Sequence, residues 1–311
     1  MKRIFSLTLL YLLCAFFSFS DLAAVTQSGR LRFALIPENP RPGEPVTLAV
    51  GGEQAVSATL LAGDRRLAAA SFFAVPAEGE NPGFMAALLT IPSKAASGLA
   101  YIRVEGRNGV LSYIFFEIEP RDFVSEVIEL NETLTEIRTD PRRTAESEQL
   151  WAILSRTGKD FYTDGVFSPP VTSTRRTSFF GDYRVFKYSN GASDTSVHAG
   201  IDYGVPTGTP VSACATGKVV MARSRIVTGN SVVIEHLPGV YSLYYHLDKI
   251  GVNEGDFVTT GTQLGLSGST GLATGPHLHW EIRVSGENTD PDAMIARSIL
   301  DKDAILGRIG N

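Results

Sequence analysis

Gly275-Pro276-His277-Leu278-His279-Trp280-Glu281 marks the point where a loop gives way to a predicted strand that runs to Val284. Polar and apolar residues alternate from His277 onward, which is the period of a β-strand with one buried face. His277, His279 and Glu281 should therefore share a face, with neighbours about 6.6 Å apart. That distance is too long for both imidazoles to bind one ion in a rigid strand, but it lets one hold a metal while the other reaches the metal's water or the substrate. Taken alone, a pair of ordinary surface or core histidines fits equally well.

Strand character continues over most of the chain from Phe167 onward, and all five histidines lie in this part. Glycine turns separate its short apolar runs, and no internal repeat is evident. We predict an antiparallel β domain over residues 165–295 and a closing tail or helix over residues 296–311. The expected strands are Pro210–Ala213, Lys218–Ala222, Ser231–Glu235, Tyr241–His246, Phe257–Val258 and His277–Val284.

A second polar pair stands in His198-Ala-Gly-Ile-Asp202. Gly200 and the Tyr-Gly-Val-Pro that follows Asp202 argue against a helix, and on a straight strand the two side chains would be ~13 Å apart. Binding to one ion would require a bend, which Gly200 permits because glycine tolerates backbone angles that other residues avoid. The pair on its own is a weak sign of a metal site.

Two further histidines fall on predicted strands. His246 ends the run Tyr241-Ser-Leu-Tyr-Tyr-His246, where alternation would place Tyr244 on the same face. His236 stands at a strand end beside a turn, and we expect it to be structural. Tyr203 and Tyr244 could equally line a groove or pack in the core.

These residues carry more weight together than singly. A catalytic zinc site takes three protein ligands of the histidine and carboxylate type and leaves a position open for water. Two histidines and Asp202 meet that number. The remaining histidines are then available for proton transfer and charge stabilisation.

The stretch from about Thr177 to Pro291 resembles the lysostaphin/LytM-type zinc metallopeptidases, a family of peptidoglycan endopeptidases. The resemblance covers about 115 residues, and the combination of its motifs is highly specific. The matching features, in chain order, are Phe180-Gly-Asp-Tyr-Arg184, His198-Ala-Gly-Ile-Asp202, Pro206-Thr-Gly-Thr-Pro-Val211, Gly217-Lys-Val219, Tyr244-Tyr-His246-Leu, Val252-Asn-Glu-Gly-Asp-Phe-Val258-Thr-Thr-Gly261, Gly265-Leu-Ser-Gly-Ser-Thr-Gly271 and Gly275-Pro-His277-Leu-His279-Trp-Glu281.

The resemblance implies one zinc ion bound by His198, Asp202 and His279, with His246 and His277 beside it as the catalytic histidines. Zinc in such a site polarises the scissile carbonyl and lowers the pKa of its water toward ~7. His277 is then the candidate general base and later proton donor to the leaving amine, and His246 the stabiliser of the oxyanion. From the sequence alone, either histidine could do either job. The expected enzyme is a zinc metalloendopeptidase that hydrolyses peptide cross-links of bacterial peptidoglycan.

Parts of the sequence also fit two other functions. Some relatives of this type have lost ligands and only activate other wall hydrolases, so the alternative is a non-catalytic or autoinhibited cell-wall-binding regulator. This chain keeps all five positions, which favours catalysis. The pattern Gly-Asp-Phe-Val-Thr-Thr-Gly over residues 255–261 also occurs in biotinyl and lipoyl carrier domains. Those domains need a lysine at a hairpin tip, and none lies between Lys249 and Lys302.

Residues 28–120 show short apolar or alternating runs separated by turn clusters, a spacing typical of a β-sandwich. No cysteine pair is present, so the immunoglobulin-like prediction concerns architecture only. The segment has no histidine and no catalytic constellation. We expect a spacer or adhesion module, with an envelope protein as the partner it would contact.

Residues 121–164 are predicted to form a partly helical linker. Asp140-Pro141 would start a helix, with aspartate as N-cap and proline at the first helical position. Leu150, Ile153 and Leu154 follow at helical spacing, and Gly158 would end the helix.

The first 24 residues carry a short basic region, an apolar run and small residues, which is the pattern of a secretory signal peptide. We therefore expect an exported protein of the bacterial periplasm or cell envelope, although an uncleaved anchor is the alternative. Lipidation at Cys14 is disfavoured because Leu13 precedes it. Cys214 would then be the one remaining cysteine, so no internal disulfide can form. The net charge of −5 argues against nucleic acid as a partner.

Overall fold

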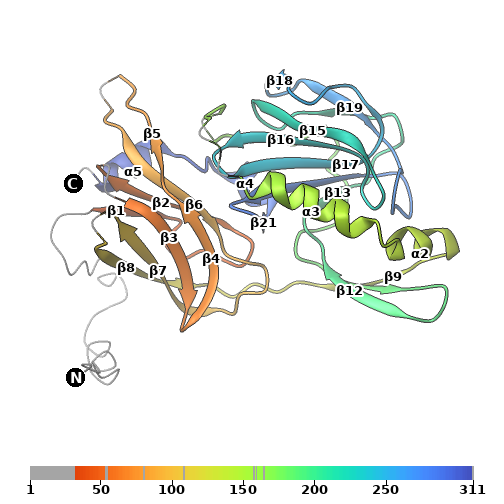
Figure 1. The fold of residues 1–311 in the computed structure, drawn as a ribbon, viewed down its shortest axis with the longest axis horizontal. Coiled ribbons are helices and arrows are strands. Elements are labelled where there is room, and N and C mark those ends of the chain that lie inside the picture. The colour runs from red at the N-terminus through yellow and green to blue at the C-terminus, as the bar shows by residue number, and fades with distance from the viewer. Residues whose placement is uncertain are drawn as a thin grey trace.

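The computed structural model describes residues 32–309, apart from 53–54, 80, 108, 157, 159 and 164. The predicted signal peptide, residues 1–24, lies outside the described residues. The mainly β fold class is confirmed, because strands far outnumber the short helices among the described elements. Figure 1 shows two β-rich parts with a helical segment between them in the chain. None of the described helices is long and apolar enough to cross a membrane.

Two four-stranded antiparallel sheets face each other in the first part, with the orders β1-β2-β6-β5 and β4-β3-β7-β8. Leu48, Leu60 and Ile102 belong to the apolar cluster between them. The sequence alone gives little sign of β4, since its alanine-rich run at residues 68–70 has little β propensity of its own. The immunoglobulin-like character of this part stays a prediction. The bounds are β1 Phe33–Ile36, β2 Pro45–Gly51, β3 Ala55–Ala62, β4 Arg65–Ser71, β5 Phe73–Val75, β6 Phe84–Thr90, β7 Gly98–Gly106 and β8 Leu111–Ile118.

The sheet that contains β2 and β6 is buried on both faces. Leu48 and Leu89 point into the sandwich, whereas Ala49 and Leu88 join a cluster shared with the second part. Adjacent residues of one strand point to opposite faces, so a doubly buried sheet needs continuous apolar runs rather than alternation. The outer face is covered in part by α5, Lys302–Ile309, whose Ile305 is fully buried.

The segment after the sandwich holds a strand and two helices: β9 Ser125–Glu129, α2 Glu132–Thr139 and α3 Arg143–Leu154. The predicted caps of the second helix are wrong. Asp140 accepts a hydrogen bond from the Arg142 N–H in a turn that ends α2, so Arg142 is the N-cap of α3. That helix ends at Leu154, before Gly158. Its Ile153 and Leu154 pack on the second part of the chain.

A ten-stranded sheet forms the second part, with the main order β10-β13-β20-β17-β16-β15-β18. A separate three-stranded sheet, β12-β11-β9, takes its edge strand from the preceding segment. The pairing of β9 with β11 is parallel, an exception to the predicted antiparallel arrangement. The remaining bounds are β10 Arg176–Ser178, β11 Tyr183–Lys187, β12 Ser193–Val197, β13 Ile201–Tyr203, β14 Pro210–Ser212, β15 Gly217–Arg225, β16 Gly229–Leu237, β17 Val240–Ile250, β18 Phe257–Val258, β19 Gln263–Ser267, β20 Leu278–Val284, β21 Glu287–Thr289 and α4 Pro291–Ala296.

Candidate metal centre

Three neighbouring strands place polar residues in one row across the large sheet. Asp202 on β13 lies opposite His279 on β20, and His279 lies opposite Tyr245 on β17. Residues that are directly opposite on antiparallel strands project to the same face. The sheet register thus brings together residues that are far apart in the sequence.

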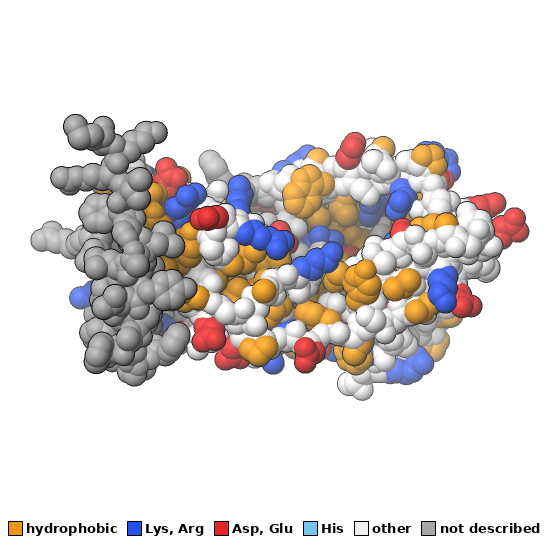
Figure 2. All heavy atoms as spheres, turned by 90° about the horizontal axis from the view of Figure 1, so that it is seen from below, with side chains coloured by type: hydrophobic (Ala, Val, Ile, Leu, Met, Phe, Trp, Pro, Cys, Tyr) orange, Lys and Arg blue, Asp and Glu red, His pale blue; other side chains and the backbone are white. Residues whose placement is uncertain are grey.

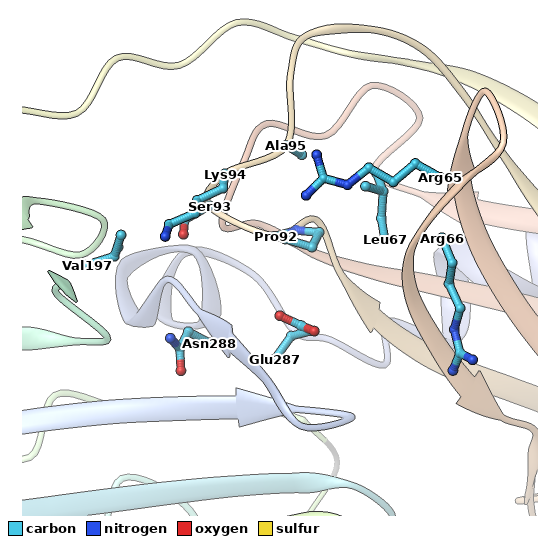
Figure 3. Close-up of a pocket in the computed structure, with 10 residues that line it drawn as sticks. All are labelled: Arg65, Arg66, Leu67, Pro92, Ser93, Lys94, Ala95, Val197, Glu287 and Asn288. Carbon is cyan, nitrogen blue, oxygen red and sulfur yellow. The ribbon is translucent and has the colours of Figure 1, made fainter. Parts of the chain in front are cut away.

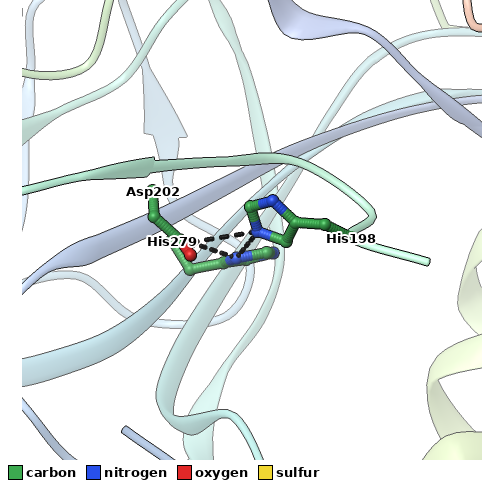
Figure 4. A group of neighbouring side chains, drawn as sticks. All are labelled: His198, Asp202 and His279. Carbon is green, nitrogen blue, oxygen red and sulfur yellow. Dashed lines mark hydrogen bonds and ion pairs between the residues drawn. The ribbon is translucent and has the colours of Figure 1, made fainter. Parts of the chain in front are cut away.

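His198 completes a cluster with Asp202 and His279 (Figure 4). The His279 Nδ1 lies 2.7 Å from Asp202 Oδ1 and 3.0 Å from His198 Nε2, and the latter lies 3.1 Å from Asp202 Oδ1. All three side chains are buried. The three residues predicted as metal ligands therefore converge, with one ligand atom from each within 4.8 Å of the others.

The hydrogen bonds at the far side of each imidazole indicate where its proton sits. His198 Nδ1 lies 2.7 Å from the Phe179 carbonyl oxygen, to which it can only donate. His279 Nε2 lies 3.0 Å from Glu281 Oε1 and donates in the same way. Once the proton that the raised pKa of His279 favours is lost to a bound cation, the other two nitrogens face the Asp202 oxygen with their lone pairs. Three lone pairs that meet in a buried space suit a bound cation.

Hydrogen-bonded and charged neighbours hold Asp202 and the adjacent Glu281 ionised. Arg184 donates to Asp202 Oδ2 at 2.6 Å, and Arg283 donates to Glu281 Oε2 at 2.8 Å. Burial would raise the pKa of both carboxyls, but His279 and His198 around Asp202, and Arg283 with His279 around Glu281, lower it instead. Burial also works to lower the pKa of His279, yet Asp202 and Glu281 outweigh it and raise that pKa to about 9.

The bend expected between His198 and Asp202 is present, but it does not depend on an unusual backbone angle at Gly200. His198 follows β12 and Asp202 lies in β13, so the chain turns between them. Gly200 does not have a positive φ. A Cβ at Gly200 would instead lie 2.1 Å from the Trp280 carbonyl oxygen. Glycine is needed here because β20 passes too close for any side chain.

His246 and His277 lie together beside the cluster. Their ring centroids are 4.8 Å apart, and His277 Nε2 is 3.9 Å from Asp202 Oδ1. The Nδ1 of His246 lies 2.7 Å from the Thr270 carbonyl oxygen, and that of His277 lies 2.8 Å from the Gly275 carbonyl oxygen. Burial, with the nearby His277 and His279, lowers the pKa of His246 to about 3, and burial also lowers that of His277.

The expected alternation along β17 fails at His246. This residue has a φ of 60°, and the pairing with β16 shifts register between Val232 and Asn230. Such an irregularity lets consecutive side chains face one side. Tyr245, not Tyr244, therefore shares the site with His246, and its ring stacks on His279 with centroids 5.5 Å apart.

The remaining aromatic and histidine candidates lie in the core. Tyr203 and Tyr244 are buried in the main apolar cluster, so packing was the correct alternative for both. His236 is also buried, with Nδ1 2.9 Å from the Thr216 carbonyl oxygen and Nε2 2.7 Å from Ser242 Oγ. Its structural role agrees with expectation. Cys214 is a buried free thiol.

A cavity of about 210 Å³ opens onto the five candidate residues. The segment that precedes the large sheet also forms part of the cavity wall. Ile128 on β9 and Leu130 just after β9 line the cavity. Arg138 on α2 and Phe186 on β11 also line it. The predicted linker is thus a part of the site rather than a passive connection.

Several contributors were not identified from the sequence as site residues, among them Arg184, Tyr245 and Glu126. Arg184 lay within a matching motif, Phe180-Gly-Asp-Tyr-Arg184, which was the one available signal for its role. Tyr245 was hidden by the register shift. Glu126, which accepts from Arg184 Nε at 2.5 Å, stands in a segment with no recognisable motif.

Comparison with known proteins identifies the second part. Residues 196–291 match the sequence model of Peptidase family M23, so the chain carries an M23 metallopeptidase domain, and the predicted resemblance is confirmed. The DD-carboxypeptidase/endopeptidase Mpg of Neisseria meningitidis serogroup B is 41% identical over 135 residues, which are 43% of this chain and 30% of that protein. The peptidoglycan DD-endopeptidase ShyA of Vibrio cholerae is 48% identical over 89 residues, which are 29% of this chain and 21% of that protein.

These matches are local. The aligned part spans less than a third of Mpg and of ShyA. A crystal structure of a Pseudomonas aeruginosa protein described as a peptidase M23 resembles a larger part of the fold, with a TM-score of 0.57 and 25% identity. That likeness covers 82% of this chain and 94% of the other, so it includes regions upstream of the M23 domain.

Proposed function

We propose that this chain is a zinc-dependent endopeptidase that hydrolyses peptide cross-links of bacterial peptidoglycan. The observation that carries the proposal is the convergence of His198 Nε2, Asp202 Oδ1 and His279 Nδ1 beside two further histidines in one cavity. The names of two relatives support the substrate class, because ShyA is a peptidoglycan DD-endopeptidase and Mpg is a DD-carboxypeptidase/endopeptidase. This substrate lies outside the cytoplasmic membrane, so the proposal includes export to the periplasm or cell envelope.

The three converging atoms would hold one zinc ion. Two imidazole nitrogens and a carboxylate oxygen are the donor set of catalytic zinc sites, which leave a further position open. Bound zinc supplies Lewis acidity, which polarises a carbonyl and acidifies a water molecule. Arg184 keeps the second oxygen of Asp202 occupied at 2.6 Å, so the first stays directed at the ion.

The two other histidines would move protons. Each has its Nδ1 proton directed at a backbone carbonyl, which leaves Nε2 as the nitrogen that faces the reaction. The lowered pKa values keep both rings neutral at neutral pH. We assign His277 to accept the proton of the attacking water and pass it to the leaving amine. His246 is assigned to the carbonyl oxygen: because its resting ring carries its proton on Nδ1, Nε2 would take up a proton from solvent as negative charge develops on that oxygen, and the protonated ring would stabilise the charge.

Metal content and digestion products test the proposal together. Purified wild-type protein should contain about one zinc per chain and release cross-link fragments from peptidoglycan, as weighed by mass spectrometry. His279→Ala should lose both properties. His236→Gln is the matched control, because it removes a buried histidine of the same domain that lies outside the site.

The outcomes separate the alternatives. A wild-type protein without zinc would contradict the metal assignment. A protein that holds zinc and binds peptidoglycan but releases no fragments would instead be the non-catalytic or autoinhibited regulator considered from the sequence.

A further inference from the structure

A second cavity of about 370 Å³ lies at the junction between the sandwich and the peptidase domain. The sandwich contributes the start of β4 and the loop after β6, and the peptidase domain contributes Val197 and β21. Figure 3 shows these segments around a common space. The lining residues are Arg65, Arg66, Leu67, Pro92, Ser93, Lys94, Ala95, Val197, Glu287 and Asn288.

The charges of this junction pocket are unbalanced. The side chains of Arg65, Arg66 and Lys94 are exposed and make no hydrogen bond or ion pair within the described part of the chain, whereas Glu287 is the one carboxylate in the lining. Many other arginines, such as Arg121 and Arg184, are paired. The view from below in Figure 2 shows basic side chains around the middle of the molecule, where its two parts meet. Such a concentration of unpaired positive charge favours an anionic ligand.

An unsatisfied acceptor lies in the same lining. Asn288 Oδ1 is buried and has no hydrogen-bond partner among the described residues. The residue itself is held by strand pairing, because Asn288 lies opposite Arg283 in the β20–β21 hairpin. A buried amide oxygen without a donor can be satisfied by an N–H group of a ligand. The pocket lining therefore includes a polar atom whose hydrogen-bonding capacity is not used by any described residue.

The junction pocket and the cavity at the metal centre share one lining residue. Val197 lines both cavities and immediately precedes the ligand His198. In Figure 3, Lys94 extends toward Val197. A peptide in an extended conformation advances about 3.3 Å per residue. For one peptide to occupy both cavities, the chain that lies across the metal centre would pass Val197 and place its next residues in the junction pocket.

We propose that the junction pocket is a substrate subsite that binds a free carboxylate of the peptide on one side of the scissile bond. The inference rests on the proposed function and adds a source of specificity to it. Arg65, Arg66 and Lys94 would attract the carboxylate, and the Asn288 side chain would turn its buried oxygen toward the peptide to accept a backbone N–H. The sandwich then takes part in substrate binding, and peptides with amidated carboxyl groups bind more weakly.

Binding measurements can test this without turnover. In the His279→Ala background, we would titrate two fluorescein-labelled stem-peptide dimers, one with free carboxylates and one with the same groups amidated. The triple variant Arg65→Gln/Arg66→Gln/Lys94→Gln should weaken binding of the free-acid peptide about 10-fold and leave the amidated peptide unchanged. The matched control is Arg103→Gln/Arg107→Gln/Lys249→Gln, which removes the same charge from exposed positions outside both cavities.

Each result decides the matter. The subsite would be overturned if the His279→Ala protein bound the two peptides with equal affinity. It would also be overturned if the two triple variants lost equal affinity for the free-acid peptide. A selective loss would support it even if the wild-type chain released no fragments from peptidoglycan, so failure of the proposed function is recognisable separately. With an active wild-type background, the same triple variant should raise KM for the free-acid substrate and leave kcat unchanged.

Discussion

At the scale of single residues, the metal centre depends on which nitrogen of each imidazole carries the proton. Backbone carbonyl oxygens fix this for His198, His246 and His277. For His279, the acceptor is the side chain of Glu281. Among the acceptors of these four imidazole N–H groups, only Glu281 is a side chain, so only this acceptor can be removed by a substitution. Its own position is fixed by Arg283, so a chain of charges supports the ligand.

Replacement of Glu281 should weaken metal binding without removing a ligand. Glu281→Ala leaves His279 Nε2 without its acceptor, so the ring can rotate or change tautomer, and zinc affinity should fall about 10–100-fold. Glu281→Gln keeps an acceptor oxygen but loses the charge, and the decrease should be smaller. Competition titration with a chromophoric chelator measures both. Wild-type affinity in Glu281→Ala would contradict the proposed role.

His236 should make stability depend on pH in a way that its substitution removes. Burial lowers its pKa from 6.5 to about 4. The unfolded chain therefore binds a proton between pH 6.5 and 4 that the folded chain does not bind. The resulting stability is present above pH 6.5 and is lost as pH falls, by about 2–3 kcal/mol between pH 7.5 and pH 4.5.

Urea unfolding at those two pH values checks this prediction in wild type and His236→Gln. Other groups titrate in both proteins, so the relevant quantity is the difference between the two pH-dependent losses. The variant should lose about 2–3 kcal/mol less than the wild type on acidification. Equal losses would show that His236 becomes protonated in the folded state at its ordinary pKa.

At the scale of elements, the period of two was enough to predict β20 and the shared face of His279 and Glu281. The same rule failed on β17, since a left-handed residue at His246 and a register shift are invisible in the pattern. The start of α3 was also misplaced, because Asp140 has the composition of an N-cap but is used in the turn that ends α2. The local sequence pattern thus predicts regular strands. Register shifts and displaced helix starts depend on contacts with other elements, which the pattern does not show.

Gly200 links the bend of the ligand segment to the position of β20. Gly200→Ala would place a Cβ 2.1 Å from the Trp280 carbonyl oxygen, so β13 and β20 must separate. We expect a loss of about 1–3 kcal/mol of stability and a weaker zinc site, because Asp202 and His279 lie on these two strands. Gly51→Ala is the control, since a Cβ there would meet no atom within 4 Å. Thermal unfolding and zinc titration of the two variants should differ clearly. Wild-type behaviour of Gly200→Ala would contradict the close-approach argument.

At the scale of the whole molecule, the two β-rich parts share one apolar cluster. Ala49, Ala86 and Leu88 of the sandwich belong to the same cluster as Ile282 and Ile305 from the later chain. From the sequence, these residues were assigned to separate domains. The spacing of apolar residues along a strand shows that one of its faces is buried, but it does not show which element covers that face. The doubly buried strands β2 and β6 were the available sign that the sandwich is not an independent body.

This shared cluster predicts a single cooperative unfolding transition. Ile305 is fully buried on α5, which contacts β1 and β2 of the sandwich. Ile305→Ala should cost about 2–5 kcal/mol, the usual range for a buried isoleucine, and should lower the Tm of both parts together, because neither keeps its covered face alone. Asp303→Asn, an exposed change on the same helix, should leave the Tm nearly unchanged.

Differential scanning calorimetry distinguishes the possibilities. Two separate transitions in the wild type would mean that the sandwich folds independently of the peptidase domain. A shift of only one transition in Ile305→Ala would mean the same. A single shifted transition would mean that the sandwich is held rigidly against the M23 domain, as its proposed contribution to the junction pocket requires.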